Sequence, residues 1–89
     1  MDINQIKRKL EENGFYVGET DKTEVLHAGI SSEKHEELDI DIIRTPFWTQ
    51  IINGKIFIRY LSGQIEQTEY FDEITAYINF IKFKLPKAP

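Results

Sequence analysis

The chain has 89 residues, with 11 basic and 15 acidic side chains, 40% hydrophobic residues and no cysteine. This length suits one hydrophobic core, so we expect a single domain over residues 1–89. A net charge of −4 disfavours nucleic-acid binding, and the lack of cysteine excludes disulfides, thiolate metal sites and thiol nucleophiles. No apolar run has the length of a signal peptide core or a membrane span, so we expect a cytoplasmic protein without membrane contact.

The first residues predict an amphipathic helix. Asp2 can cap its N-terminus with Gln5 as the capping-box partner, and Gly14 supplies a stop. The apolar positions of the helix form one narrow stripe, made of Ile3, Ile6 and Leu10.

The next part of the chain predicts strands. Residues 15–18 and 23–30 have the composition of strands joined by a polar turn, and the charged residues 31–37 predict a loop. Residues 38–43 alternate strictly, with Leu38, Ile40 and Ile42 on one face and Asp39 and Asp41 on the other. Thr45-Pro46 ends this strand, because proline cannot donate a hydrogen bond to a ladder.

A β-hairpin follows in residues 47–61. Asn53-Gly54 favours a two-residue type I′ turn, which pairs Ile52 with Lys55 and, at the far end, Phe47 with Tyr60. Ser62-Gly63 predicts a second two-residue turn, which would pair Tyr60 with Ile65 and Arg59 with Glu66.

The last helix is expected to begin near Asp72 as its cap and to run to about Lys84. Its core stripe consists of Phe71, Ile74, Tyr77, Ile78, Ile81 and Leu85, with Phe80 and Phe83 on the opposite side. The pattern predicts an α+β fold: an antiparallel meander of four or five strands with an N-terminal and a C-terminal helix packed on one face.

The hairpin register divides the sheet into two faces. Face one, which we expect beneath the helices, carries Phe47, Thr49, Ile51, Ile56, Ile58 and Tyr60, joined by Ile65 and by Leu38, Ile40 and Ile42. Face two carries Trp48, Gln50, Ile52, Lys55, Phe57, Arg59 and Leu61. A short connection at Thr45-Pro46 would place Asp39, Asp41 and Ile43 beside it.

Face two holds the candidate binding residues. Trp48, Arg59 and Glu66 line up across three strands, where a cation–π contact and an ion pair would hold the indole flat on the sheet. Tryptophan and arginine are enriched in binding hot spots. The candidate partner-binding residues are Trp48, Ile52, Phe57, Arg59, Glu66, Asp39 and Asp41, with Phe80 and Phe83 as a second contact. The alternative is a purely structural face, or one that a helix covers.

Chemistry-bearing residues are few. The acidic stretch from His35 to Asp41 has no recognised metal-ligand spacing, and His27 lies in the middle of a strand, where a structural or surface role is expected. No nucleophile, base or phosphate-loop motif occurs. We therefore expect neither an enzyme nor a bound metal or cofactor.

Three hypotheses on function remain. The first is a non-enzymatic domain, such as an inhibitor, regulator or adaptor, that binds another protein through face two. The second is a structural homodimer that buries face two or the pair Phe80 and Phe83. The third is a small nucleic-acid or ligand binder that stacks a base on Trp48 beside Arg59.

Overall fold

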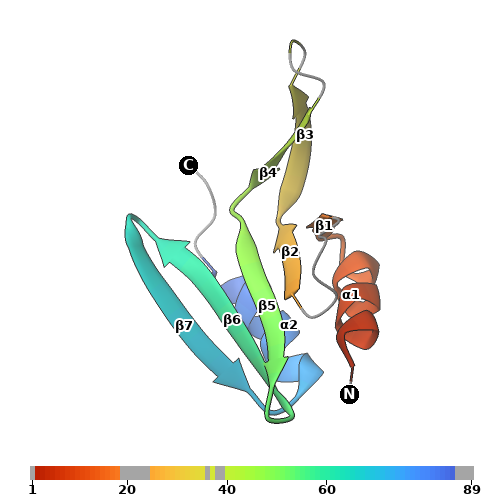
Figure 1. Ribbon diagram of the computed structural model, residues 1–89, viewed down its shortest axis with the longest axis vertical. Coiled ribbons are helices and arrows are strands. Elements are labelled where there is room, and N and C mark those ends of the chain that lie inside the picture. Colours follow the sequence, from red (N-terminus) through yellow and green to blue (C-terminus); the bar gives the residue numbers. More distant parts are fainter. Residues whose placement is uncertain (1, 19–24, 36, 38–39, 86–89) are drawn as a thin grey trace.

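The computed structural model describes residues 2–18, 25–35, 37 and 40–85 (Figure 1). In chain order, its helices and strands are α1 (Ile3–Glu12), β1 (Tyr16–Gly18), β2 (Val25–Gly29), β3 (Ser31–His35), β4 (Ile40–Arg44), β5 (Phe47–Ile52), β6 (Lys55–Ser62), β7 (Ile65–Phe71) and α2 (Ile74–Phe83).

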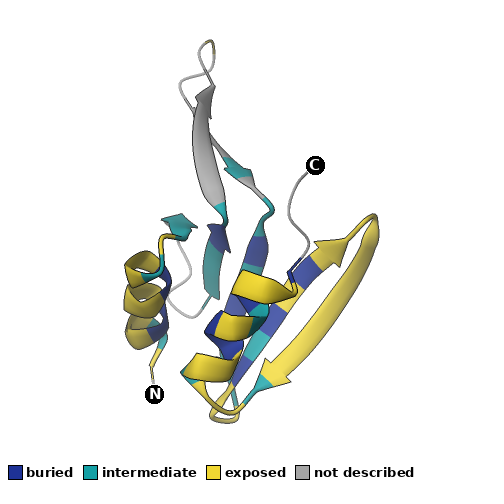
Figure 2. Cartoon of the chain, turned by 180° about the vertical axis from the view of Figure 1, so that it is seen from behind, coloured by how far each residue is buried: buried dark blue, intermediate teal, exposed yellow. Residues whose placement is uncertain are grey.

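A five-stranded antiparallel sheet of order β1-β2-β5-β6-β7 forms the centre of the molecule. Helix α2 lies behind this sheet in Figure 1 and in front of it in Figure 2, and α1 packs beside it against β1 and β2. The buried side chains of both helices belong to one core with face one. The α+β class, with an N-terminal and a C-terminal helix, is therefore confirmed.

Helix α1 begins and ends as its sequence predicts. The Asp2 side chain accepts a hydrogen bond from the Gln5 backbone N–H (3.0 Å), and the Gln5 side chain accepts one from the Asp2 backbone N–H (2.9 Å). Gly14 follows the last turn with φ +84°, which glycine adopts without steric cost. Ile6 and Leu10 are fully buried, so the apolar stripe does face the core.

The β5–β6 hairpin has the predicted register at every pair from Phe47↔Tyr60 to Ile52↔Lys55. The turn residues Asn53 and Gly54 have φ of +52° and +75°, the positive values that a type I′ turn requires. A short local signal therefore fixes the alignment of the two central strands.

The second turn lies one residue later than predicted, which shifts the pairing of β6 with β7 by two residues. Ser62 pairs with Ile65 and Arg59 with Thr68, so the turn residues are Gly63 and Gln64 rather than Ser62 and Gly63. Gly63 has φ +66°, and type II′ turns place glycine at the first central position, not the second. A shift of two residues leaves every side chain on its predicted face, because side chains alternate with a period of two.

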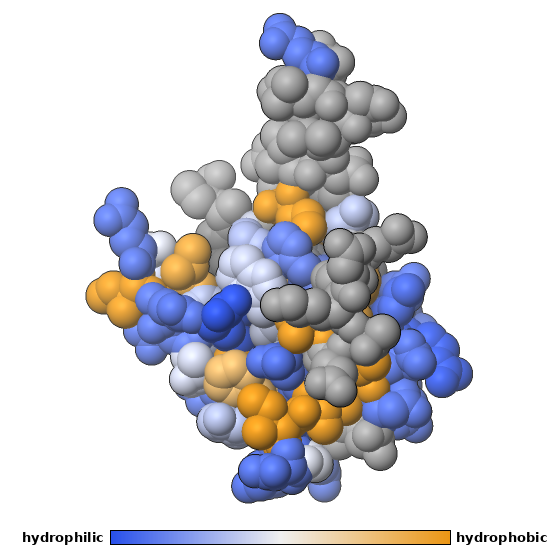
Figure 3. Space-filling model, viewed as in Figure 1, coloured by the Kyte–Doolittle hydropathy of each residue, from blue (hydrophilic) through white to orange (hydrophobic). Residues whose placement is uncertain are grey.

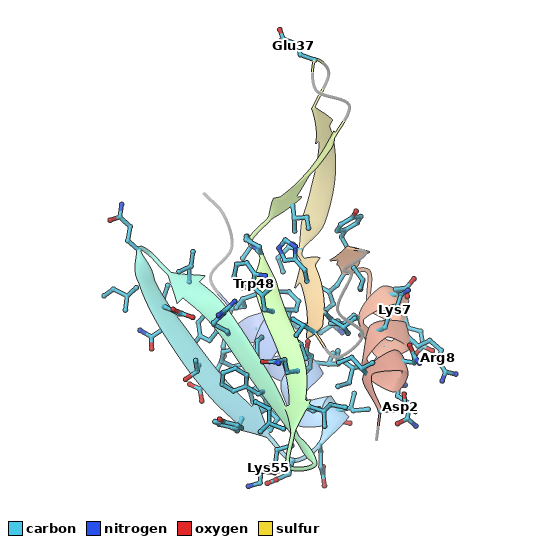
Figure 4. The ribbon with its side chains drawn as sticks, in the orientation of Figure 1. Asp2, Lys7, Arg8, Glu37, Trp48 and Lys55 are labelled. Carbon is cyan, nitrogen blue, oxygen red and sulfur yellow. The ribbon has the colours of Figure 1, made fainter. Side chains whose placement is uncertain are left out.

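The prediction for residues 31–43 was wrong in two respects. Residues 31–35 form strand β3 rather than part of a loop, and β4 pairs with β3 rather than with β5. This two-stranded hairpin, which we call the arm, projects beyond both helices, with Glu37 at its tip (Figures 1 and 4). The predicted extension of face one by Ile40 and Ile42 is therefore wrong, and Leu38 lies outside the described residues.

The arm continues the ladder between β2 and β5. Ala28 pairs with Phe47, and three residues further along each strand Ser31 pairs with Arg44, so the register is unchanged across the interruption. At the interruption Thr45 has φ +50°, and Pro46 has no N–H to donate. The prediction that Thr45-Pro46 ends this strand is confirmed, since β4 ends at Arg44, but the neighbour of β4 is the preceding strand and not the following one.

Helix α2 supplies most of the core from the C-terminal side. Tyr77, Ile78, Ile81 and Leu85 are buried, and Phe71 and Ile74 pack against them, as the stripe predicts. The N-cap is Glu73 rather than Asp72. Asp72 lies 3.4 Å from Lys55 in an exposed ion pair across the sheet end.

Face one forms the floor of the core. Its members Phe47, Thr49, Ile56, Ile58 and Tyr60 are buried, and Ile51 packs against the core cluster. The Thr49 hydroxyl is satisfied by that of Tyr77 on α2, at 2.6 Å. Ile65 lies on the face-one side of β7, as predicted, but the expectation that a helix covers it was wrong, because its side chain is 66% exposed. Strands β6 and β7 extend past the end of the helical layer (Figure 2).

Candidate protein-interaction surface

Face two of the sheet carries no helix among the described residues and faces the viewer in Figure 3. Hydrophobic and strongly hydrophilic side chains lie side by side on it. The register brings to this face residues from four adjacent strands: His27 from β2, Trp48 and Ile52 from β5, Phe57, Arg59 and Leu61 from β6, and Glu66, Thr68 and Tyr70 from β7.

A row of four side chains crosses this face from β2 to β7, and we call it the His-Trp-Arg-Glu row. The rings of His27 and Trp48 are parallel with centroids 5.0 Å apart. The Arg59 guanidinium carbon lies 5.0 Å from the centroid of the Trp48 ring. Arg59 Nε is in turn 3.2 Å from Glu66 Oε1. The predicted contacts of Arg59 with Trp48 and Glu66 are therefore present, although Glu66 is a diagonal neighbour rather than the direct pair.

The indole ring has a neighbour from each of the two strands beside β5. His27 comes from β2 and Arg59 from β6, and both lie about as far from the ring centre as neighbouring strands lie from each other, roughly 4.8 Å. The row therefore includes His27, which the prediction left out.

A second aromatic pair lies beside the row. Phe57 and Tyr70 face each other across β6 and β7 with centroids 4.9 Å apart, and Tyr70 is 55% exposed. Three members of the row, Trp48, Arg59 and Glu66, line a shallow hollow of about 210 Å³ together with Tyr60 and Leu61. Figure 4 shows Trp48 at the end of β5 nearest the arm. Aromatic, apolar and charged groups thus alternate over a continuous surface.

His27 is the site residue that the sequence reasoning missed. Burial lowers its pKa below the ordinary 6.5, so the imidazole is neutral at pH 7. Its Nε2 atom is buried and has no hydrogen-bond partner among the described residues. Its place on face two follows from the pairing of β2 with β5. The composition of residues 23–30 predicts a strand but does not say which strand it pairs with.

The other predicted residues lie in different places. Ile52 is half-buried at the turn end of β5 on face two. Asp41 pairs with Lys34 in the arm rather than beside face two, and Asp39 lies outside the described residues.

The predicted second contact is divided between a core residue and an exposed one. Phe80 packs on Tyr60 and Phe71, each at 5.3 Å between centroids, so it belongs to the core and not to an exposed pair. Phe83 is 78% exposed.

Within the described ranges, no group of three or more His, Cys, Asp or Glu side chains has the geometry to hold a metal ion. In the same part of the chain, no helix is long and apolar enough to cross a bilayer. No family model, curated protein or solved structure matches the chain.

Proposed function

We propose that this chain is a non-enzymatic, cytoplasmic interaction domain that binds a partner protein through face two, as an inhibitor, a regulator or an adaptor. The observation that supports this proposal is the His-Trp-Arg-Glu row with its neighbouring Phe57–Tyr70 pair, on a sheet face that neither of the two described helices covers. Tryptophan, tyrosine and arginine are the residue types that dominate binding hot spots.

The row is preorganised for binding. Arg59 is held between the Trp48 ring and the Glu66 carboxylate, and Trp48 is held between Arg59 and His27. Side chains that are already ordered lose less conformational entropy when a partner binds, so more of the contact energy appears as affinity.

The contacts of Trp48 favour a protein partner over a nucleic acid. A base stacks on a free aromatic face, whereas the ring of this indole is already stacked on His27 and in contact with the Arg59 guanidinium. The net charge of −4 also opposes contact with phosphates.

The experiment that tests the proposal compares partner capture by matched variants. Trp48→Ala and Arg59→Ala should each weaken binding by about 2 kcal/mol or more, the threshold of a hot spot. Their controls are Phe83→Ala, an exposed aromatic on α2, and Arg8→Ala, an exposed arginine on α1. Equal capture by all four variants would refute the role of face two, and a loss confined to Phe83→Ala would place the contact on α2.

A second measurement uses Trp48 as the only tryptophan. Its quenching by a neutral quencher over a dilution series, with the molar mass from light scattering alongside, separates a free face from a self-association surface. Constant quenching in a monomer supports a partner protein. Protection of Trp48 that is lost as a dimer dissociates would instead support a homodimer through face two.

A further inference from the structure

The two edges of the five-stranded sheet are unequal. At one end, β1 has only three residues. At the other, β7 has seven, six of them exposed, and no described strand or helix pairs with its outer edge (Figure 2). Edge strands are usually protected by charged side chains, most often lysine, by proline, by a bulge or by a short length, and the only charged residues in β7 are Glu66 and Glu69. Strand β7 contains neither lysine nor proline, and its pairing with β6 is continuous from Ile56↔Phe71 to Ser62↔Ile65, without a bulge.

The register shows which backbone groups of β7 are free. In a two-residue hairpin, the pair next to the turn exchanges both hydrogen bonds, and bonded and non-bonded pairs then alternate. Ser62↔Ile65 is that pair, so residues 65, 67, 69 and 71 bond to β6. The N–H and C=O groups of Glu66, Thr68 and Tyr70 therefore point away from the sheet. These three residues also have their side chains on face two, so a strand added here would extend the candidate surface.

The negative charge at this edge disfavours a second copy of the chain and favours a basic partner segment. All four acidic residues in the second half of the chain, Glu66, Glu69, Asp72 and Glu73, lie in β7 or directly after it, and no basic residue occurs between Arg59 and Lys82. Glu66 and Asp72 have ion-pair partners, whereas Glu69 and Glu73 have none among the described residues. A second copy paired through β7 would bring two such acidic sets together, and like charges across strands are destabilising.

We propose that the partner protein adds an extended segment to β7, antiparallel to it, with basic residues on the side of Glu69 and apolar residues on the side of Tyr70. This inference rests on the proposed function and specifies how the partner is held. Main-chain hydrogen bonds to Glu66, Thr68 and Tyr70 provide affinity, and the alternation of side chains provides specificity, as in other cases of strand addition. Glu69 lies on the face-one side of β7 and Tyr70, 55% exposed, on face two, so the two requirements fall on alternate residues of the added segment.

The test uses a synthetic peptide of about nine residues, long enough to span β7, in which lysine and valine alternate and both ends are blocked. A second peptide has glutamate in place of lysine. Amide hydrogen exchange and titration of the labelled protein are followed by NMR. Strand addition predicts slower exchange at the amides of Glu66, Thr68 and Tyr70, and binding of the glutamate peptide about tenfold weaker or worse.

Variants isolate the backbone contribution. Thr68→Pro removes an outward N–H, which an edge strand tolerates, and should weaken peptide binding by about tenfold or more. Thr68→Ala removes the side chain but keeps the N–H, and should bind the peptide about tenfold more tightly than Thr68→Pro does. If Thr68→Pro fails to fold, Glu69→Lys keeps the backbone edge and should weaken binding of the lysine peptide while strengthening that of the glutamate peptide.

Several results would overturn strand addition. The first is that the lysine peptide does not bind, and the second is that Thr68→Pro binds it as tightly as the wild type does. The third is that dimerisation protects the β7 amides when no peptide is present. If natural partner capture depends on Trp48 and Arg59 while the peptide protects no β7 amide, the proposed function stands and strand addition fails. If the peptide protects the β7 amides but substitutions of Trp48 and Arg59 do not change partner capture, the proposed role of face two is refuted and strand addition at β7 is retained.

Discussion

Removing one of the two hydroxyl groups buried between β5 and α2 should destabilise the fold more than removing both. Thr49 Oγ1 and Tyr77 Oη are 2.6 Å apart, and both residues are fully buried. Tyr77→Phe strands the threonine hydroxyl without its partner, and Thr49→Val strands the phenol. Each change should cost about 1–3 kcal/mol, because an unsatisfied buried polar group carries its full desolvation penalty.

The double variant replaces both groups by apolar ones of similar shape and should cost about 1 kcal/mol or less. The coupling free energy of the cycle is then about 1 kcal/mol or more, with the double variant more stable than additivity predicts. Urea unfolding followed by the fluorescence of Trp48 measures all four proteins, since each keeps the only tryptophan. Each kcal/mol should also lower Tm by about 4–8 °C.

An additive cycle would refute the reasoning, because it would mean that the two hydroxyls do not satisfy each other. A Tyr77→Phe variant as stable as the wild type would refute it as well. Either result would mean that the contact between Thr49 on face one and Tyr77 on α2 does not stabilise the fold.

Three further predictions concern the core and the row. Ile78→Ala should lower the free energy of unfolding by about 2–5 kcal/mol, because the side chain is buried. The same change at Ile65, which is 66% exposed, should lower it by about 0.5 kcal/mol or less. Equal losses for the two variants in urea unfolding would contradict the position of α2. Trp48→Ala should cost about 1–2.5 kcal/mol, the sum of its contacts with His27 and Arg59, and a loss above about 3 kcal/mol would make it a core residue. Because burial lowers the pKa of His27, the unfolded chain binds a proton first as pH falls, so stability should decrease below about pH 6.5 and level off beneath the folded pKa. His27→Phe keeps a ring beside Trp48 and should reduce this dependence; an unchanged pH profile would show that His27 does not cause it.

The sequence predicted those features of the fold that depend on a few adjacent residues. The capping box of Asp2 and Gln5 and the register set by Asn53-Gly54 are local signals with one dominant solution each. The second turn was less determined, since Ser62-Gly63 and Gly63-Gln64 both make two-residue turns. Only the position of glycine within the turn separates them.

Strand neighbours could not be predicted in the same way. Residues 38–43 have the alternation of a strand, but the pattern does not say whether the partner precedes or follows it. The pairing of β2 with β5 is long-range in sequence and left no local signal, so His27 was missed. Face assignment survived these errors at Trp48, Phe57, Arg59 and Glu66, because a side chain's face depends only on the parity of its position in the strand.

The arm divides the molecule into parts that should open independently. Among the described strands, β3 and β4 pair with each other and with no other strand, and Thr45 and Pro46 interrupt the ladder where it joins the sheet. Local opening of such a unit exposes none of the buried core cluster and breaks few contacts outside the hairpin, such as the approach of Ile43 to Gly18, and isolated hairpins are marginally stable. In hydrogen exchange under increasing denaturant, the amides of β3 and β4 should exchange with little denaturant dependence, while those of β5 and β6 should follow global unfolding. A substitution that weakens the core would then accelerate exchange in the sheet and leave the arm unchanged.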